Sequence, residues 1–365
     1  MTKQLYSFDP DYVVPPGETL LETIESLGMS QAELAERTGV TTKHINGIIK
    51  GKAAITPRTA LQFERVLGVP ATFWNNLETN YREKLAELEE RKQLESEILW
   101  LKQLPLKVLL DRGWMKKGHD NVEQVKEALN FFGCASVEKW KELWQKVLNS
   151  PEVAYRKSVA FESEVGAVSA WLRQGELEAQ HINSKPFNAA TFRKALKEIR
   201  LLTKEDPDIF VPRMVELCAE AGVCVVFVPE IPRCRVNGAT RWLTPTKALI
   251  QLSLRYKTDD HLWFTFFHEA GHILLHGKKG YFLEVADNHN DQEDEANKFA
   301  ADFLIPHDSY KTFLKGKITK SRVISFANQV GIAPGIIVGR LQHDGYLSYR
   351  FFNDLKVRLV WSDDI

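Results

Sequence analysis

The pattern of apolar and polar positions divides the chain into three zones. Residues 1 to about 70 form short helical segments joined by tight turns, and residues from about 71 to 205 carry longer helical periodicity. From about 206 onward, apolar runs typical of buried strands appear at Val223–Val228 and Ala248–Leu254, followed by two strong helices and a helical tail. The pattern predicts a mainly α protein with a small α+β domain, divided into domains 1–75, 76–205 and 206–365.

A long helix is predicted over Asn76–Gln103, ended by Pro105. Its apolar stripe consists of Leu77, Tyr81, Leu85 and Leu88 and continues through Leu94, Ile98 and Leu101. The opposite face is dense in Glu and Lys. An apolar seam of this width is typical of a dimer contact and, equally, of packing against the same chain, so both interpretations stay open.

Length and composition fit a multidomain globular protein. The chain has 365 residues, more than one hydrophobic core usually organises, with 44% hydrophobic and 26% charged residues. Lys+Arg and Asp+Glu balance at 48 each, so any nucleic-acid binding must come from a local basic patch. No apolar run approaches the ~20 residues of a membrane span, no secretory signal begins the chain, and the four cysteines form no CxxC pair. We expect a cytoplasmic protein with reduced thiols and no membrane contact.

The segment that begins at Ser30 has the pattern of a helix-turn-helix. Ser30 is a good N-cap, and Glu33 three positions later completes a capping box. The first helix is predicted to end at Gly39, because a sharp turn favours glycine there, and Thr41 caps the second helix. The buried face of that second helix is predicted to consist of Ile45, Ile48 and Ile49.

The outward face of the second helix carries residues suited to DNA. Thr42, Lys43, Asn46, Gly47 and Lys50 are left to point away from the core, where they can contact base edges and phosphates. The stretch between Arg37 and Phe63 has no acidic residue. Its five basic residues are Arg37, Lys43, Lys50, Lys52 and Arg58. Such a local concentration of positive charge favours binding to a phosphate backbone.

Residues of about 15–80 resemble the Xre-type helix-turn-helix family and, more closely, HigA-type antitoxins. The resemblance lies in PGETLLETIESLGMSQAELAERTGV, GKAAITPRTALQFERVLGVP and FWNNLE. It implies a homodimer that binds palindromic double-stranded operator DNA and represses its own promoter. The predicted DNA-contacting set is Gln31, Thr42 and Lys43 near the bases, Lys50 near phosphate, and Asn46 and Lys52 beside them.

The strongest chemical signal is the HExxH sequence of residues 268–272, inside DDHLWFTFFHEAGHILLH. Asp259 or Asp260 can cap this helix, and its apolar residues predict that it is buried. His268 and His272 are four residues apart and therefore lie on one face, where both imidazoles can bind one metal ion. Glu269 lies beside them, where it can activate a water molecule at the metal.

A zinc hydrolase of this kind needs a third protein ligand and one open position. The following helix, QEDEANKFAADFLIP, is predicted to begin at Asp291, to end at Pro306 and to supply that ligand. We predict Glu293, because it shares a face with small residues that let two helices approach closely. Those residues are Ala296, Asn297 and Ala300. Glu295 points about 160° away from Glu293 and is the second choice.

Other polar residues near this motif receive secondary roles. His276 is predicted to lie behind the ligands or in the core, because it falls too far along the helix axis to bind the same metal. His289 is expected in a solvated loop. Tyr281, His289 and Arg241 are equal candidates for stabilising an oxyanion.

Residues of about 215–345 resemble the ImmA/IrrE metallopeptidases. The resemblance lies in the HExxH sequence, in EDEANKFAADFLIP with Ile305 before the proline, and in the GIAPGIIVGRLQHDG tail. It implies a gluzincin-like zinc endopeptidase with zinc held by His268, His272 and Glu293, Glu269 as general base, and a transcriptional repressor as substrate. In that family peptidase and repressor are commonly separate proteins, whereas here both lie on one chain.

Two further segments are assigned to packing. The aromatic residues between 105 and 205 are predicted to be core, namely Trp114, Phe131, Phe132, Trp140, Trp144 and Trp171. The tail Ser325–Leu341 has the pattern of another helix-turn-helix, with Gly331 at the turn and Pro334 at a helix start. Because Arg340 is its one outward basic residue, we predict that it packs against the peptidase domain.

These features predict a DNA-binding transcriptional regulator with a zinc endopeptidase domain that cleaves a repressor-type helix-turn-helix segment, its own or a partner's. The alternative is a HigA-like antitoxin and autorepressor with a toxin partner, whose metal fold is a scaffold or sensor without proteolysis. A metal-sensing repressor is a third hypothesis.

Overall fold

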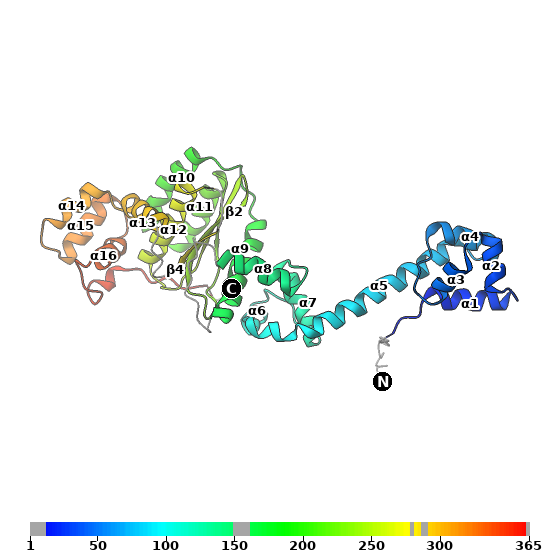
Figure 1. Cartoon of the computed structure of the whole chain (residues 1–365). Coiled ribbons are helices and arrows are strands. Elements are labelled where there is room, and N and C mark those ends of the chain that lie inside the picture. The colour runs from blue at the N-terminus through cyan, green and yellow to red at the C-terminus, as the bar shows by residue number, and fades with distance from the viewer. Residues whose placement is uncertain (1–11, 149–160, 278–280, 286–290, 363–365) are drawn as a thin grey trace, which may run out of the picture. The chain divides into compact units, whose positions relative to one another are not determined.

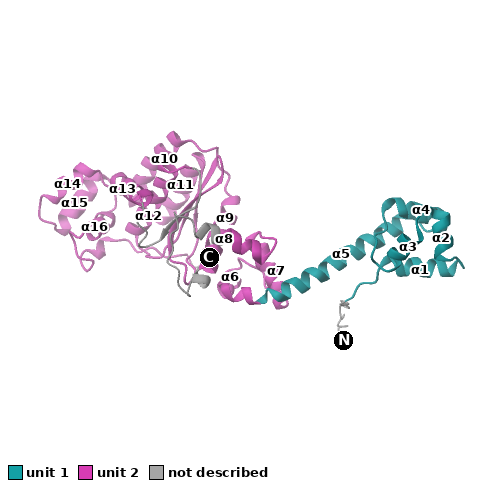
Figure 2. Ribbon diagram, in the orientation of Figure 1, with its two compact units in different colours: residues 1–98 teal, residues 99–365 magenta. Residues whose placement is uncertain are grey.

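The structure is a computed structural model of the whole chain, and it describes residues 12–148, 161–277, 281–285 and 291–362. The chain divides into two compact units, Met1–Ile98 and Leu99–Ile365 (Figure 2). A separate N-terminal helical unit was expected, while the predicted domain limits at 75 and 205 stay predictions. Among the described residues, no single helix has both the length and the apolarity to cross a membrane. The helices Lys320–Val330 and Pro334–His343 meet these criteria only as a pair, which is bent by 114°.

The described part of the first unit is helical (Figure 1). Its helices are α1 (Pro16–Ser26), α2 (Gln31–Thr38), α3 (Thr42–Ile49), α4 (Pro57–Leu67) and α5 (Ala71–Ser96). The predicted caps are confirmed: Ser30 Oγ accepts a bond from the Glu33 amide at 3.1 Å, and Thr41 caps α3 through the His44 amide at 3.2 Å. Gly39 ends α2 with a φ of 73°, which explains the glycine at this turn.

The core of the first unit joins α3 to the helices around it. A Cβ atom on Gly17 of α1 would overlap the backbone of Ile48 and Ile49, so α1 lies directly on α3. Of the three predicted positions, Ile45 and Ile48 are buried and Ile49 is partly buried. The larger buried side chains here are Leu20, Ile24, Leu34, Phe63 and Trp74.

The long helix differs from its predicted bounds. It begins at Ala71 rather than Asn76 and gives way after Ser96 to a 3₁₀ segment, η1 (Ile98–Gln103). Pro70 occupies the position before the helix, where its missing backbone amide costs no helical hydrogen bond. The first part of the seam packs on its own chain, since Leu77 contacts the core of the first unit.

The second unit holds the remaining elements. Its helices are α6 (Leu106–Asp111), α7 (Asn121–Phe132), α8 (Val137–Leu148), α9 (Phe161–Gln180), α10 (Ala189–Leu201), η3 (Leu202–Lys204), α11 (Pro207–Glu220), α12 (Asp259–Leu275), α13 (Asp291–Leu304), α14 (His307–Leu314), α15 (Lys320–Val330), α16 (Pro334–His343) and η4 (Asn353–Leu355). Its strands are β1 (Val223–Phe227), β2 (Val236–Thr244), β3 (Lys247–Leu252) and β4 (Tyr281–Val285).

Within the described residues, the strands form one sheet in the order β1-β3-β2-β4. β1 runs parallel to β3, and β2 pairs antiparallel with both β3 and β4. Thr240 of β2 is opposite Ile250 on one side and Phe282 on the other. The two apolar runs of the sequence are β1 and β3, whereas β2 and β4 were not predicted.

Different helices cover the two faces of this sheet. Gln251 of β3 donates from its amide to the carbonyl of Trp171 on α9 at 2.7 Å, which places α9 on one face. On the other face, Val223 and Val225 of β1 join the core formed with α10, α11 and α12. The predicted packing role of the tail is confirmed, because α15 and α16 contribute Phe326 and Ile337 to the same core.

The aromatic residues of the middle segment are core with one exception. Trp140, Trp144 and Trp171 are each at most 2% exposed, and the ring of Trp140 meets that of Phe132 edge-on at 5.6 Å. The prediction is wrong for Trp114, which is partly exposed and lies under the guanidinium of Arg112, a contact that needs no burial.

The two acidic residues at the start of α12 do not cap it, contrary to expectation. Thr258 holds the cap position without a side-chain bond, and Asp259 and Asp260 lie in the first turn. Both carboxylates instead fasten the C-terminal segment: Asp259 accepts a bond from the Val357 amide at 2.9 Å, and Asp260 pairs with Lys356 at 2.7 Å.

Replacing Asp259 with asparagine is expected to stabilise the second unit near neutral pH. Burial, together with the charge of Asp260, raises the pKa of Asp259 from 3.8 to about 6. The folded state therefore binds more protons than the unfolded state between about pH 4 and 6, and the free energy of unfolding falls as pH rises through that window. Asparagine keeps the acceptor for Val357, so Asp259→Asn should add about 1–3 kcal/mol at pH 7 and flatten this slope.

Urea unfolding measured from pH 4 to 7 tests this. Asp260→Asn serves as the neighbouring control and should lower stability at pH 7, because it removes the partner of Lys356. A loss of stability in both variants at pH 7 would contradict the expectation.

Candidate metal centre and helix-turn-helix surface

Helices α12 and α13 approach each other closely at small residues. A Cβ atom on Gly271 would lie 3.3 Å from the Cα atom of Ala296. A larger residue at position 271 would therefore require the two helices to move slightly apart. Ala296 and Ala300 are fully buried on the face of α13 that carries Glu293. The predicted small-residue face is therefore the one that brings α13 against the HExxH helix.

This approach brings His268, His272 and Glu293 together, with one ligand atom of each within 4.8 Å of the others. Glu293 Oε2 lies 3.1 Å from His268 Nε2, and its Oε1 lies 3.4 Å from His272 Nε2. The two Nε2 atoms are 3.0 Å apart. All three side chains are at most 5% exposed. Two imidazole nitrogens and a carboxylate converging in a buried place form a donor set typical of zinc sites.

The protonation states also suit a metal. Burial lowers the pKa of His272 to about 4, so its ring is neutral at pH 7. Burial alone would raise the pKa of Glu293, but hydrogen bonds from His268 and His272 bring it down to about 2. Neutral imidazole and ionised carboxylate are the forms that bind a metal ion.

A second layer of residues orients both imidazoles. Asn297 Oδ1 lies 3.0 Å from His268 Nδ1, and His276 Nδ1 lies 2.9 Å from His272 Nδ1. His276 Nε2 in turn contacts Glu295 Oε2 at 3.2 Å. With each Nδ1 engaged, each Nε2 is directed at Glu293. His276 thus lies behind the ligands as expected, and Glu295, whose side chain is 65% exposed, lies outside the three-residue cluster.

Glu269 is fully buried against strand β2. Thr240 Oγ1 donates to Glu269 Oε2 at 2.6 Å. Gly238, on the same face of the strand, passes so close that a Cβ atom there would lie 2.6 Å from Glu269 Oε1. Sequence reasoning missed Thr240 and Gly238, because β2 carries no continuous apolar run that would have marked it as a strand.

Of the three candidates for oxyanion stabilisation, the structure describes the side chain of Arg241. Arg241 alternates with Thr240 along β2 and forms an ion pair with Glu176 of α9, on the face of the sheet away from Glu269. Because successive side chains of a strand point to opposite faces of the sheet, Arg241 is directed away from the candidate metal centre. His289 and the side chain of Tyr281 lie outside the described residues.

The helix-turn-helix surface of the first unit presents the predicted residues. Thr42, Lys43, Lys50 and Lys52 are exposed, while Gln31 and Asn46 are partly exposed. Gly47, also predicted to point outward, is partly exposed. A Cβ on this residue would lie 3.1 Å from the Cβ of Ala53, and its carbonyl accepts the amides of Lys52 and Ala53, so it faces the turn after α3.

Two family profiles match the chain. The one described as helix-turn-helix matches residues 20–74, and the one described as an IrrE N-terminal-like domain matches residues 237–342. The first covers α2, α3 and α4, and the second covers the HExxH helix and Glu293.

Relatives match the N-terminal part. Virulence-associated protein I of Dichelobacter nodosus is 35% identical over 79 residues, 21% of this chain and 73% of the relative. An uncharacterized HTH-type transcriptional regulator, YddM of Escherichia coli (strain K12), is 31% identical over 75 residues, 20% of this chain and 78% of the relative.

Among solved structures, an addiction module antidote protein of a HigA family from Coxiella burnetii is 35% identical, with 22% of this chain and 90% of that chain covered and a TM-score of 0.21. The chain belongs to the Xre-like helix-turn-helix family through its N-terminal part and carries an IrrE-like domain, of a zincin-like metallopeptidase family, towards its C-terminus.

Proposed function

We propose that this protein is a DNA-binding transcriptional regulator whose second unit is a zinc-dependent endopeptidase. The observation that carries the proposal is the buried cluster of His268, His272 and Glu293, with Glu269 one residue from the first ligand. The substrate we propose is a helix-turn-helix repressor segment, of this chain or of a partner, whose cleavage derepresses an operon.

The residues divide the chemistry between them. Bound zinc would polarise the scissile carbonyl and lower the pKa of water at the centre. Glu269 accepts the proton of the attacking water and passes it to the leaving amine. Thr240 donates a hydrogen bond to Oε2 of Glu269 at 2.6 Å, which fixes the orientation of the carboxylate. His276 and Asn297 keep the imidazoles of His272 and His268 turned towards Glu293.

The peptidase half is tested on the full-length protein. Elemental analysis should find one zinc per chain. The purified protein should cleave a helix-turn-helix repressor or itself. Glu269→Gln should abolish this cleavage while zinc stays bound. Cleavage that persists in Glu269→Gln, or a protein that binds no zinc, would contradict the proposal. An intact chain that represses its operator under every inducing condition would favour the antitoxin alternative.

The DNA half predicts a division of roles within the first unit, which we propose acts as a homodimer on a palindromic operator. Thr42→Ala and Lys43→Ala should each cost about 1–3 kcal/mol of discrimination against mismatched operators, because these exposed side chains lie at the start of α3. Lys50→Ala should weaken binding to all sequences alike and lower the slope of log K against log salt by about 1.

Fluorescence anisotropy on operator and scrambled duplexes, at several salt concentrations, measures both effects. Glu83→Ala, an exposed residue of α5 outside the predicted surface, is the control and should change neither quantity. An equal, sequence-independent loss in Thr42→Ala, Lys43→Ala and Lys50→Ala would show that α3 is not the reading helix.

A further inference from the structure

The second unit contains a cavity that the proposed chemistry does not use. It has a volume of about 470 Å³ and lies between α12, α13, α16 and the segment that follows α16. Its apolar wall includes Phe264, Leu304, Ile305 and Ile336. This volume falls within the usual range for sites that bind a small molecule, roughly 300–1,000 Å³.

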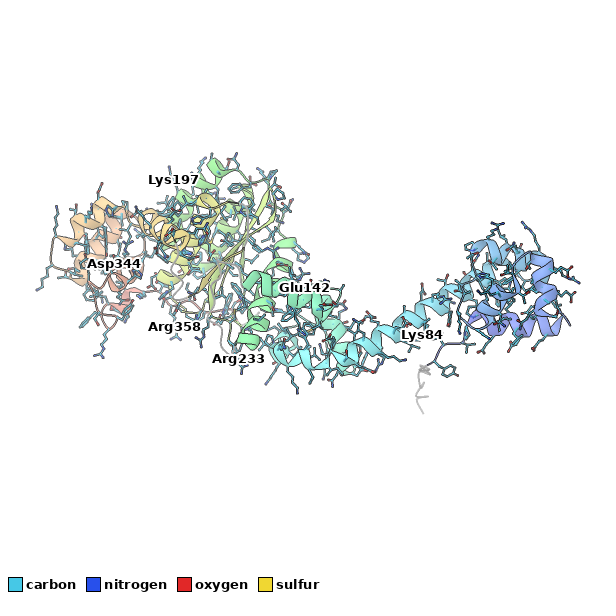
Figure 3. The ribbon with its side chains drawn as sticks, in the orientation of Figure 1. Lys84, Glu142, Lys197, Arg233, Asp344 and Arg358 are labelled. Atoms are coloured by element: carbon cyan, nitrogen blue, oxygen red, sulfur yellow. The ribbon has the colours of Figure 1, made fainter. Side chains whose placement is uncertain are left out.

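The ionic side chains around the cavity are either paired or open to solvent. Asp260 pairs with Lys356 at 2.7 Å, and Arg340 pairs at the same distance with Asp344, which Figure 3 labels. Three further ionic side chains line the cavity. Lys298 and Asp294 are exposed and opposite in sign, and the carboxylate of Asp302, 40% exposed, lies 3.8 Å from His307 Nδ1. The ionic side chains outside these pairs are solvated, so water screens their attraction for a charged ligand, and that ligand would also lose its hydration against the apolar wall. An uncharged apolar molecule has little hydration to lose. The wall therefore favours an uncharged, mainly apolar occupant.

The cavity borders the metal centre at Phe264, whose ring centroid lies 6.3 Å from that of His268, and at Asn297. Asn297 lines it and also contacts His268 Nδ1 at 3.0 Å. The Nε2 atom of the same ring faces Glu293, and the two ring nitrogens point in nearly opposite directions. The cavity consequently lies behind His268, away from the place where a peptide carbonyl would meet Glu293 and Glu269.

We propose that this cavity binds a small, uncharged, mainly apolar effector and that its occupancy strengthens metal binding through Asn297. An apolar occupant removes water from around Asn297, and its hydrogen bond to His268 becomes stronger in the drier surroundings. Partners of this kind set metal affinity, and losing one costs about 10–100-fold. The binding of an effector concerns the cavity alone. The effect of the effector on metal affinity rests on the proposed zinc site.

Binding is tested by calorimetry with the full-length protein and 4-phenylbutan-1-ol, beside the charged analogues 4-phenylbutylamine and 4-phenylbutanoate. The alcohol should bind at one site with a Kd below about 1 mM and at least tenfold more tightly than either analogue. Ala301→Trp, a half-buried position on the cavity wall, should abolish binding. Ala190→Trp, on the exposed start of α10, should leave it unchanged. No binding of the alcohol, equal binding of the charged analogues, or binding that survives in a folded Ala301→Trp variant would overturn the cavity assignment.

Coupling is tested by chelator competition for zinc with and without saturating alcohol. We expect zinc affinity to rise at least threefold in the unmodified protein and not at all in Ala301→Trp. An unchanged or lowered affinity overturns the coupling even if the alcohol binds. If the protein binds the alcohol but no zinc, the zinc site and its coupling to the cavity are both contradicted. The assignment of the cavity as a binding site is not affected by that result.

Discussion

Replacing Glu293 with glutamine is expected to reduce zinc affinity by roughly two to three orders of magnitude. Structural zinc sites of four ligands bind with about 10–16 kcal/mol, so one ligand accounts for about 2.5–4 kcal/mol. The amide keeps the size of the side chain but removes the negative charge that faces His268 Nε2 at 3.1 Å and His272 Nε2 at 3.4 Å. Competition with a chromogenic chelator, together with elemental analysis, measures the loss.

The neighbouring residue supplies the control for that experiment. Asp294 is exposed on the same turn of α13, so Asp294→Asn removes the same charge without touching the cluster. We expect its zinc affinity to stay within about twofold of the unmodified protein. One zinc bound with unchanged affinity in Glu293→Gln would mean that the metal, if held at all, is held by other residues.

The sequence was most informative where structure depends on neighbours along the chain. The caps at Ser30 and Thr41 and the turn at Gly39 follow from local rules, and the structure agrees with them. The choice of Glu293 over Glu295 also followed from helical spacing, and Glu293 is the residue that α13 directs at the two histidines. Helical periodicity therefore identifies which side chains of each helix can bind the metal, and the packing of α12 on α13 brings them together.

Contacts between distant segments were out of reach of the same reasoning. Nothing in the sequence of β2 aligns Thr240 with Glu269, because that contact depends on sheet register and on which face α12 covers. The acidic residues at the start of α12 suggested a helix cap. Asp259 instead accepts a hydrogen bond from the amide of Val357, almost a hundred residues later in the chain. Such pairings arise from tertiary packing, and local pattern carries no record of them.

The second large effect is expected at Gly238, and it separates the position of the general base from metal binding. In Gly238→Ala the new Cβ would lie 2.6 Å from Glu269 Oε1 and 2.5 Å from Thr265 Cγ2, distances that non-bonded atoms do not tolerate. Glu269 cannot simply turn away, because Thr240 holds its other oxygen at 2.6 Å. Either that bond breaks or β2 shifts, and a displacement of about 1 Å at a catalytic group costs about a hundredfold in rate.

Gly277→Ala is the matched control, since a Cβ at that position meets nothing within 4 Å and the residue directly follows His276. We expect Gly238→Ala to lose about a hundredfold in peptidase turnover while one zinc per chain remains, and Gly277→Ala to retain both. Because Gly238 approaches Glu269 and Thr265 and none of the three proposed ligands, loss of zinc in Gly238→Ala would indicate damage to the fold rather than to the base. Full turnover in a folded, zinc-bound Gly238→Ala protein would mean that the proton is taken by a group other than Glu269, since no carboxylate held between β2 and α12 could keep its place.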